Sequence, residues 1–336
     1  MNILITGGCG FIGSHFVLRL IEQGHNPIIL DDLSNSSPKV LEAIKKISGK
    51  EPELIKGSIL DRGLLNEIFS NFKFDSVVHF AASKSIGESV INPYKYYLNN
   101  FVGTLNLIDF MRENGVFKLV FSSSAAVYGD AKEVPIKEES ALVPTNPYGK
   151  SKLMTEVFLR DIFKAEKNWN IVMLRYFNPI GAHSSGLIGE WPTTPYNIIP
   201  IISDVALGKK ESLKIFGNDY PTSDGTCVRD YIHIEDLVDG HLKALKFIDH
   251  NKNLSYFNLG TGKGTSVLDL ISCFEEVSGK RIPVDYIERR EGDVPVLYTD
   301  PLKAKNELGF NASRSLHKMC EDTWRWLSNN PNGYDL

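Results

Sequence analysis

Short runs of consecutive apolar residues alternate with longer segments of helical periodicity through the first half of the chain. The apolar runs predict strands at residues 2–6, 26–30, 53–55, 76–80, 118–122 and 171–175. The segments between them predict helices at residues 13–23, 63–71, 93–115 and 148–167. Repeated strand–helix units of this kind predict a parallel, doubly wound sheet with right-handed crossovers.

The pattern changes after residue 178. Residues 178–232 are rich in Pro, Gly, Asn and Thr, whereas helical patterns return at 235–248, 267–278 and 316–329. Aromatic and aliphatic residues within 178–232 argue against disorder. The sequence predicts either a long binding segment or a smaller second domain here.

A glycine-rich run follows the first predicted strand and opens the first predicted helix. Gly7, Gly10 and Gly13 stand in the context that a dinucleotide-binding turn requires. Glycine lets the backbone approach a pyrophosphate, and the helix N-terminus favours its negative charge. Asp31 ends the second predicted strand, where a carboxylate can accept hydrogen bonds from an adenosine ribose. Because the sequence offers no nearby arginine for a 2′-phosphate, the pattern favours NAD over NADP.

Tyr148 and Lys152 are four residues apart and therefore share one face of a predicted helix. A lysine ammonium beside a phenol favours the phenolate, which can take a proton from an alcohol. Ser124 closes a serine triplet at the end of a predicted strand, where its hydroxyl can bind the reacting oxygen. Each feature alone is weak, but their order together predicts oxidation of a carbinol by a nicotinamide cofactor.

The composition argues against several classes of function. The net charge of −4 gives no indication of nucleic-acid or membrane binding. The four cysteines are far apart and show no metal-ligand spacing, which favours a reducing cytoplasm and no bound metal. The chain enters a predicted strand at residue 2 without a signal peptide, and none of its apolar stretches approaches the ~20 residues of a membrane span.

Motifs spread along the chain resemble those of the extended short-chain dehydrogenase/reductase superfamily and, within it, the UDP-glucose (UDP-galactose) 4-epimerases. The matching segments are residues 7–13, 79–81, 87–89, 121–129, 148–154, 174–181, 215–221, 224–233, 258–260 and 289–293. The resemblance implies an α/β fold, a Rossmann-type doubly wound parallel sheet with a smaller mixed α/β substrate-binding domain. We expect an NAD-binding domain at residues 1–177, to which segments near 228–258 return, and a mainly UDP-sugar-binding domain at 178–336.

The family's residue roles carry over by position. Tyr148 corresponds to the catalytic base, Lys152 to the residue that lowers its pKa, and Ser124 to the partner of the sugar oxygen. The expected NAD contacts are Gly7, Gly10, Phe11, Ile12, Gly13, Asp31, Asp32, Leu33, Ser34, Asn35, Ser36, Ser58, Ile59, Phe80, Ala81, Ala82, Ser83, Lys84, Asn99, Ser122, Tyr148, Lys152 and Phe177. The expected UDP-sugar contacts are Ser124, Tyr148, Asn178, Asn197, Phe216, Arg229, Tyr231, Arg290, Asp293 and Leu297.

The resemblance implies a reversible epimerisation at C4 of a UDP-hexose. Tyr148 would take the C4 hydroxyl proton as hydride passes to NAD, and the transient 4-keto sugar would turn over before hydride returns to its other face. Arg229 and Arg290 suit a diphosphate because guanidinium groups form paired hydrogen bonds with phosphate. Relatives commonly form homodimers through two helices, for which residues 93–115 and 148–167 are the candidates here.

Two positions depart from the family pattern. Ser58 stands where many relatives carry an acidic residue that reaches the adenine amine, so one charge-assisted contact is lost. Leu297 stands where the family's side-chain bulk decides whether an N-acetyl group fits beside the sugar. Leucine is intermediate in size, which leaves the acceptance of UDP-N-acetylhexosamines open.

Other functions remain as alternatives. A nucleotide-sugar 4,6-dehydratase would usually carry Asp-Glu after the catalytic hydroxyl, whereas Ala125 and Ala126 follow Ser124 here. A uronate epimerase on the same fold is a second alternative. A non-catalytic NAD-sensing module is the third, although such a module would be expected to lose Tyr148 or Lys152. We expect structural roles for His79 and His233.

Overall fold

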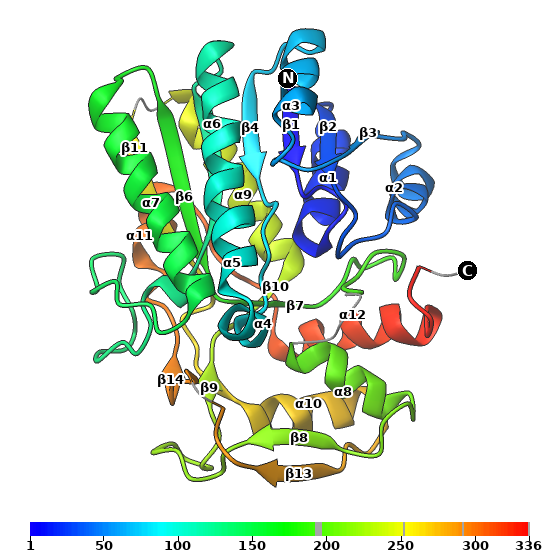
Figure 1. Cartoon of the computed structure of the whole chain (residues 1–336). Helices are drawn as coiled ribbons and strands as arrows, with labels where there is room; N and C mark the ends of the chain where they lie inside the picture. Colours follow the sequence, from blue (N-terminus) through cyan, green and yellow to red (C-terminus); the bar gives the residue numbers. More distant parts are fainter. Residues whose placement is uncertain (192–196, 251–252, 291, 335–336) are drawn as a thin grey trace. The chain divides into compact units, whose positions relative to one another are not determined.

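The computed structural model describes residues 1–191, 197–250, 253–290 and 292–334. The chain forms two compact units, each assembled from three segments. The first unit comprises Met1–Gly129, Leu142–Arg175 and Val238–Phe257, and the second comprises Asp130–Ala141, Tyr176–Leu237 and Asn258–Leu336. Figure 1 colours these segments by their place in the sequence.

A seven-stranded sheet forms the centre of the first unit. Its strand order is β11-β6-β5-β4-β1-β2-β3, and the pairs from β3 to β5 are parallel. The order reverses beside β1, which is typical of a doubly wound Rossmann-type sheet. The strands are β1 Asn2–Thr6, β2 Asn26–Asp31, β3 Glu53–Lys56, β4 Ser76–His79, β5 Lys118–Ser124, β6 Asn170–Tyr176 and β11 Leu254–Leu259. All six strands predicted in the first half of the chain are confirmed, as is the α/β fold class.

Helices cover both faces of this sheet. In Figure 1, α6 and α7 lie in front of it and α9 lies behind it. Leu107 and Met111 of α6 and Leu159 of α7 belong to one fully buried core with the strands. On the other face, Phe16 of α1 and His241 of α9 have ring centroids 5.9 Å apart. The helices are α1 Phe11–Glu22, α2 Val40–Ser48, α3 Arg62–Asn71, α4 Ile86–Ile91, α5 Pro93–Tyr96, α6 Gly103–Glu113, α7 Pro147–Ala165 and α9 Ile234–His250.

The helix predicted at residues 93–115 is interrupted. A π-helical turn, η1 Tyr97–Val102, separates α5 from α6. The turn contains neither glycine nor proline, so nothing in its composition predicts a break in the helix. A π-helical turn widens the backbone spiral and is often found at functional sites.

The second unit contains short strands and four helices among its described residues. Strands β7 Asn178–Ile180 and β10 Tyr231–His233 pair in parallel, as do β8 Leu213–Phe216 and β13 Val284–Ile287. Strand β9 Val228–Arg229 lies between β12 Thr265–Ser266 and β14 Val296–Leu297. The helices are α8 Ile198–Ala206, α10 Val267–Ser278, α11 Leu302–Glu307 and α12 Leu316–Asn329.

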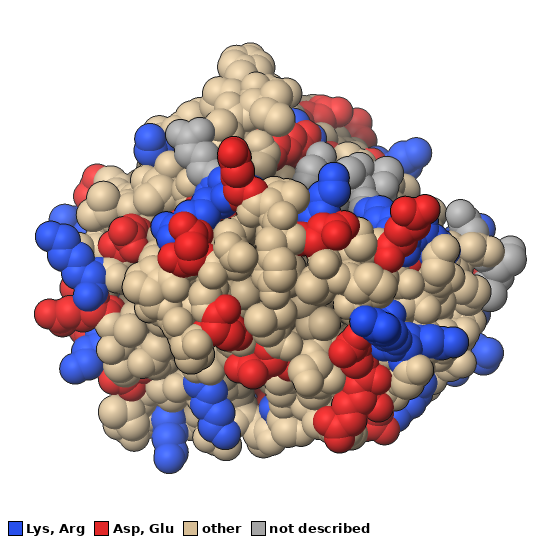
Figure 2. All heavy atoms as spheres, turned by 90° about the horizontal axis from the view of Figure 1, so that it is seen from below, with Lys and Arg blue, Asp and Glu red and all other residues tan. Residues whose placement is uncertain are grey.

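The core of the second unit forms where α10 packs on α12. Phe274 and Trp324 join the two helices edge to face with ring centroids 6.0 Å apart, and Trp326 is 1% exposed. The bounds predicted for these two helices, 267–278 and 316–329, agree with the structure. On the face of the molecule shown in Figure 2, Lys and Arg side chains lie among Asp and Glu side chains.

Candidate active site

The glycine turn of the first unit is built to bring backbone close to a ligand. Gly7 has a φ of 72°, and a Cβ on it would lie 2.7 Å from the amide nitrogen of Ala81. A Cβ on Gly13 would lie 2.2 Å from the Gly7 carbonyl oxygen. Gly10 caps α1 without a side-chain hydrogen bond, and the first turn of α1 carries no acidic residue. The turn therefore fits a pyrophosphate, which the N-terminal N–H groups of a helix favour.

Asp31 organises the loop that follows β2. Its carboxylate accepts hydrogen bonds from Leu33 N at 2.9 Å, Cys9 N at 2.9 Å and Ser36 Oγ at 2.8 Å. Burial raises the pKa of Asp31, and these three hydrogen bonds oppose the rise. Leu33 adopts a φ of 61°, a left-handed conformation that non-glycine residues seldom take. A carboxylate has about four acceptor positions, so Asp31 retains capacity for a ribose hydroxyl.

Asn100, which the sequence reading missed, ties two parts of the candidate NAD site together. Its Oδ1 accepts from Ser83 N at 2.8 Å, and its Nδ2 donates to Ser83 O and Ser151 Oγ, both at 3.0 Å. Ser83 belongs to the loop after β4 and Ser151 to α7. Asn100 and Asn99 both lie in η1, so the π-helical turn places one amide in the core and leaves its neighbour partly exposed.

Ser58 has a local structural role. Its Oγ accepts from Leu60 N at 3.2 Å, and its carbonyl oxygen accepts from Asp61 N at 3.0 Å. The hydroxyl can still donate one hydrogen bond. The neighbouring Ile59 is 3% exposed and packs in the core of the first unit.

Tyr148, Lys152 and Ser124 meet where α7 packs on the end of β5. Asn146 caps α7 by accepting from Gly149 N at 2.9 Å, which fixes the first turn that carries Tyr148. Burial raises the pKa of Tyr148, and a hydrogen bond with Ser124 opposes the rise. Lys152 Nζ donates to the Ser122 carbonyl oxygen at 2.7 Å. Burial lowers the pKa of Lys152 to about 7, so its charge depends on its surroundings.

Two proposed substrate residues of the second unit, Arg229 and Arg290, lie at the carboxylate of a third, Asp293. Arg290 donates to Asp293 through Nε at 3.2 Å and Nη2 at 3.0 Å. Arg229 Nη2 lies 3.7 Å from Asp293 Oδ1. The Arg290 guanidinium also lies over the ring of Phe216, 5.2 Å from its centroid, and Phe216 is 36% exposed. Two guanidinium groups beside a half-open aromatic face fit a nucleoside diphosphate.

The other predicted substrate residues lie on short elements of the second unit. Asn178 and Tyr231 are paired in the register of β7 and β10, and Leu297 of β14 is paired with Arg229 of β9. Asn197 caps α8, and its Nδ2 donates to Glu190 Oε1 at 3.1 Å. Glu291, within the matching segment 289–293, lies outside the described residues.

Asp230, also missed, holds several of these elements together. It is fully buried, and its carboxylate accepts from Thr261 N at 2.8 Å, Gly262 N at 3.0 Å and Thr299 N at 3.2 Å. Its own amide donates to the Leu297 carbonyl oxygen at 3.1 Å. Asp230 therefore fixes the backbone that carries its neighbours in sequence, Arg229 and Tyr231.

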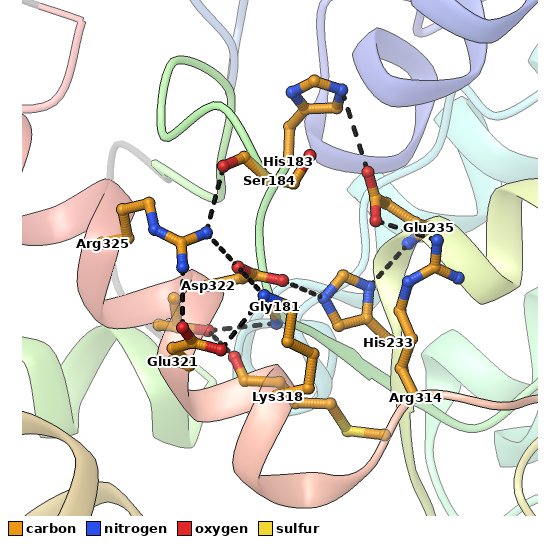
Figure 3. A network of polar contacts seen from close by, with 12 residues as sticks. Gly181, His183, Ser184, His233, Glu235, Arg314, Lys318, Glu321, Asp322 and Arg325 are labelled. Atoms are coloured by element: carbon orange, nitrogen blue, oxygen red, sulfur yellow. Dashed lines mark hydrogen bonds and ion pairs between the residues drawn. The ribbon is translucent and has the colours of Figure 1, made fainter.

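His233 has a structural role, as Figure 3 shows. Glu235 N donates to its Nδ1 at 3.0 Å, so Nε2 carries the proton and donates to Asp322 Oδ2 at 3.2 Å. Burial favours a higher pKa for Asp322, but hydrogen bonds from His233 and Lys318 outweigh it and lower the pKa. Arg325 contacts the same carboxylate. The pair is fully buried within a network of the second unit.

His79 also has a structural role, and its partners are neutral hydroxyl groups. Its Nδ1 lies 2.6 Å from Thr6 Oγ1 and its Nε2 lies 2.8 Å from Thr104 Oγ1. Burial and the charge of Lys152 lower the pKa of His79 to about 3, so the ring is neutral. Its contacts join β1, β4 and α6 in the core.

The described residues contain no group of three or more His, Cys, Asp or Glu side chains placed to hold a metal ion. None of the described helices combines the length and the apolar character needed to cross a membrane.

The chain is similar to known proteins over its whole length. A family model described as GDP-mannose 4,6 dehydratase matches residues 4–323. The UDP-glucose 4-epimerase of Haemophilus influenzae is 53% identical over 336 residues and that of Bacillus subtilis is 50% identical over 335, each comparison covering 99% of both chains. The crystal structure of the Bifidobacterium longum UDP-glucose 4-epimerase in complex with NAD+ and UDP superposes with a TM-score of 0.97 at 44% identity, covering 99% of this chain and 100% of that one.

Proposed function

Because this chain belongs to the family of the UDP-glucose 4-epimerases, we propose that it interconverts UDP-galactose and UDP-glucose while holding NAD. One observation carries the proposal most directly. Tyr148 and Lys152 of α7 are hydrogen-bonded to Ser124 and Ser122 at the carboxyl end of β5, and β5 belongs to the same sheet as β1, which the glycine turn follows. Ligands of doubly wound sheets bind at this edge.

We assign the proton transfer to Tyr148. Ser124 holds the oxygen at C4, and Tyr148 takes its proton and later returns it, so that a 4-keto sugar exists only between the two transfers. The Lys152 ammonium stabilises the phenolate form of Tyr148. Bound NAD supplies a reversible hydride acceptor at the nicotinamide ring. The reaction leaves the sugar with its original oxidation state and an inverted C4.

In this proposal, NAD and the UDP group are bound by different sets of residues. Most of the NAD contacts belong to the first unit, and they are the glycine turn, the Asp31 loop, Ile59, the loop of residues 80–84 and Asn99. The UDP group is held by the second unit, where Arg229 and Arg290 pair with the diphosphate and Phe216 packs on uracil. Asp293 then accepts hydrogen bonds from the ribose. Phe177 remains a proposed NAD contact and Asn178, Asn197 and Tyr231 proposed sugar-nucleotide contacts.

A direct assay tests the proposed reaction. The purified protein is incubated with UDP-galactose alone, and the products are separated by chromatography. We expect UDP-glucose to accumulate until the two sugars reach equilibrium. A 4-keto-6-deoxy product would instead show a dehydratase, the activity that the family model's description carries. Ala125 and Ala126 lie where a dehydratase would need acidic side chains, and this favours the epimerase.

We expect NAD to remain with the protein through purification and to be regenerated in every cycle. The three donors that fix Asp31 orient its carboxylate for an unphosphorylated ribose, where a 2′-phosphate would meet a like charge. The measurement is the nucleotide released on denaturation, followed by reconstitution with NAD or NADP. A requirement for a stoichiometric external oxidant or reductant would identify an ordinary dehydrogenase instead.

We propose that Leu297 leaves room for an N-acetyl group, so that UDP-N-acetylglucosamine is also epimerised. Leu297 is partly buried on β14 and is held by the Asp230 amide. Leu297→Tyr should suppress this activity selectively, because added bulk in a packed pocket costs about 1–3 kcal/mol, or about 5- to 150-fold in rate. The measurement is kcat/KM for both sugars in both proteins. An equal fall for both sugars would show that Leu297 is ordinary packing.

We also propose a homodimer formed through η1 and α7 of each copy. Phe101 and Phe158 join these elements with ring centroids 6.3 Å apart, and Val102, Met154 and Val157 are 37%, 40% and 41% exposed on them. Exposed apolar side chains on adjacent helices are typical of a contact with another protein. Light scattering after gel filtration should give twice the chain mass for the native protein. Met154→Asp/Val157→Asp should give the monomer, and a monomeric native protein would refute the dimer.

We infer a cytoplasmic location. The four cysteines are free thiols in the structure, and thiols persist in a reducing compartment. Cell fractionation with antibody detection tests this inference.

A further inference from the structure

A buried group of charged side chains lies next to the proposed reacting residues in the first unit. Glu156 Oε1 accepts from Ser123 Oγ at 2.5 Å and from Arg175 Nε at 2.9 Å. Its Oε2 accepts from Arg175 Nη2 at 2.6 Å. Glu156 is 2% exposed, Arg175 is 3% exposed and Ser123 is fully buried. Both carboxylate oxygens are therefore committed to protein donors in a dry environment.

This group joins α7 and β5, which carry the reacting residues, to the strand β6. Glu156 comes from α7, Ser123 from β5 and Arg175 from β6. Ser123 lies between Ser122, whose carbonyl accepts from Lys152, and Ser124, which binds Tyr148. Any shift of the Glu156 carboxylate would therefore be passed on to the backbone on either side of Ser123.

Glu156 also lies one helical turn after Lys152, on the same face of α7. Burial lowers the pKa of Lys152, and the Glu156 carboxylate opposes that effect. The other titratable groups around Lys152 are the neutral His79 on β4, Tyr148 on α7 and Arg175 on β6, whose charge is paired with Glu156. Glu156 is thus the one negative charge among these groups.

A gain in folding stability does not by itself explain the buried ion pair of Glu156 and Arg175. A buried ion pair is often no more stabilising than well-packed apolar side chains of the same volume, because two charges must leave water. The charge of Lys152, by contrast, has a use in the reaction. A lysine that loses its proton can no longer stabilise a phenolate.

We propose that Glu156 is a positioning residue of the reaction, and that its carboxylate, fixed by Arg175 and Ser123, acts through Lys152 as the buried counter-charge of the site. The inference rests on the proposed function for its kinetic consequences. The effect of the Glu156 carboxylate on the pKa of Lys152 does not depend on that function and can be measured without turnover.

The test compares Glu156→Gln with Glu166→Gln, the same chemical change at the end of α7. Glu166 binds Arg112 and Trp169 near the surface, away from the triplet of serines. Loss of an opposite charge lowers the pKa of an ammonium by about 1 unit or more. We expect the alkaline fall of kcat to begin about 1 pH unit lower in Glu156→Gln, with KM unchanged, and to be unmoved in Glu166→Gln.

A second readout follows Lys152 itself. Protein labelled with carbon-13 at lysine Cε is titrated by NMR, and the Lys152 signal is assigned with Lys152→Met. The Lys152 midpoint should fall by about 1 unit in Glu156→Gln. An unchanged midpoint, or a loss of kcat that is equal at every pH, would overturn the proposal. A wild-type protein without epimerase activity would refute the proposed function and leave the NMR result intact.

Glu156→Gln leaves the buried Arg175 without its counter-charge and can unfold the protein. Glu156→Gln/Arg175→Met removes both charges and avoids that cost. If the single variant does not fold, the double variant should still show a lowered Lys152 midpoint, by less than the single variant because the positive charge of Arg175 is removed as well. A midpoint equal to that of the native protein would overturn the proposal in this variant as well.

Discussion

Replacing Tyr148 with phenylalanine is expected to lower kcat at neutral pH by about 10²- to 10⁴-fold, the usual contribution of a general base. The substitution removes one hydroxyl from a side chain that is 9% exposed and hydrogen-bonded to Ser124, so the fold should change little. The ring still packs edge to face on Tyr96, with centroids 6.4 Å apart. The measurement is kcat between pH 6 and 9, with the NAD content of each preparation determined in parallel.

NAD content separates loss of the base from loss of the cofactor. We expect Tyr148→Phe to retain NAD at the native ratio, because the glycine turn and the Asp31 loop are untouched. A variant that turns over at nearly the native rate would remove Tyr148 from its role. A variant that is inactive because it has lost NAD would leave the identity of the base to be established by another substitution.

Replacing Gly13 with alanine is expected to weaken NAD binding by about 5- to 150-fold. The added Cβ would lie 2.2 Å from the Gly7 carbonyl oxygen and 2.8 Å from Gly8 Cα. Both atoms belong to the backbone of the turn, so the turn itself must move. Overpacking of this kind costs about 1–3 kcal/mol, which gives the expected range in Kd. The measurement is the Kd of NAD for protein stripped of its nucleotide.

Gly63→Ala provides the matched control. Gly63 is exposed on α3, and a Cβ there meets only the carboxylate of Asp61, the N-cap of α3, at 3.3 Å, with no backbone atom in its way. Alanine in a helix is more stable than glycine by about 0.5–1 kcal/mol, so this variant should unfold at a slightly higher temperature and bind NAD as before. Equal NAD binding by Gly13→Ala and Gly63→Ala would show that the glycine turn tolerates a side chain.

The sheet of the first unit could be predicted because its signals are local. Each strand is a run of four to seven residues bounded by helical patterns, and the glycine turn and the Tyr148–Lys152 spacing are each contained in fewer than ten consecutive residues. The partners of Glu156 could not be read in this way. Arg175 follows it by 19 positions, across the end of a helix and into a strand, and only the packing of α7 on the sheet brings them together.

The second unit was harder to predict for a different reason. Strands β9, β12 and β14 have two residues each, too few for an alternating pattern to appear. Asp230 holds this region through residues 31 to 69 positions away, so nothing near it in the sequence indicates its partners. The π-helical turn could not be predicted for a third reason. It contains no glycine or proline that would mark a break between the helical segments on either side.

The division of each unit among three chain segments has a consequence for synthesis on the ribosome. The chain passes from one unit to the other at residues 129–130, 141–142, 175–176, 237–238 and 257–258. Strand β11, at the edge of the seven-stranded sheet, is made only after residues 176–237 of the second unit have emerged. Until then the nascent sheet ends in an uncovered β6, whose free backbone groups could pair with another chain. A truncation after residue 177 would expose the same strand permanently, so fragments of this protein should aggregate where the full chain does not.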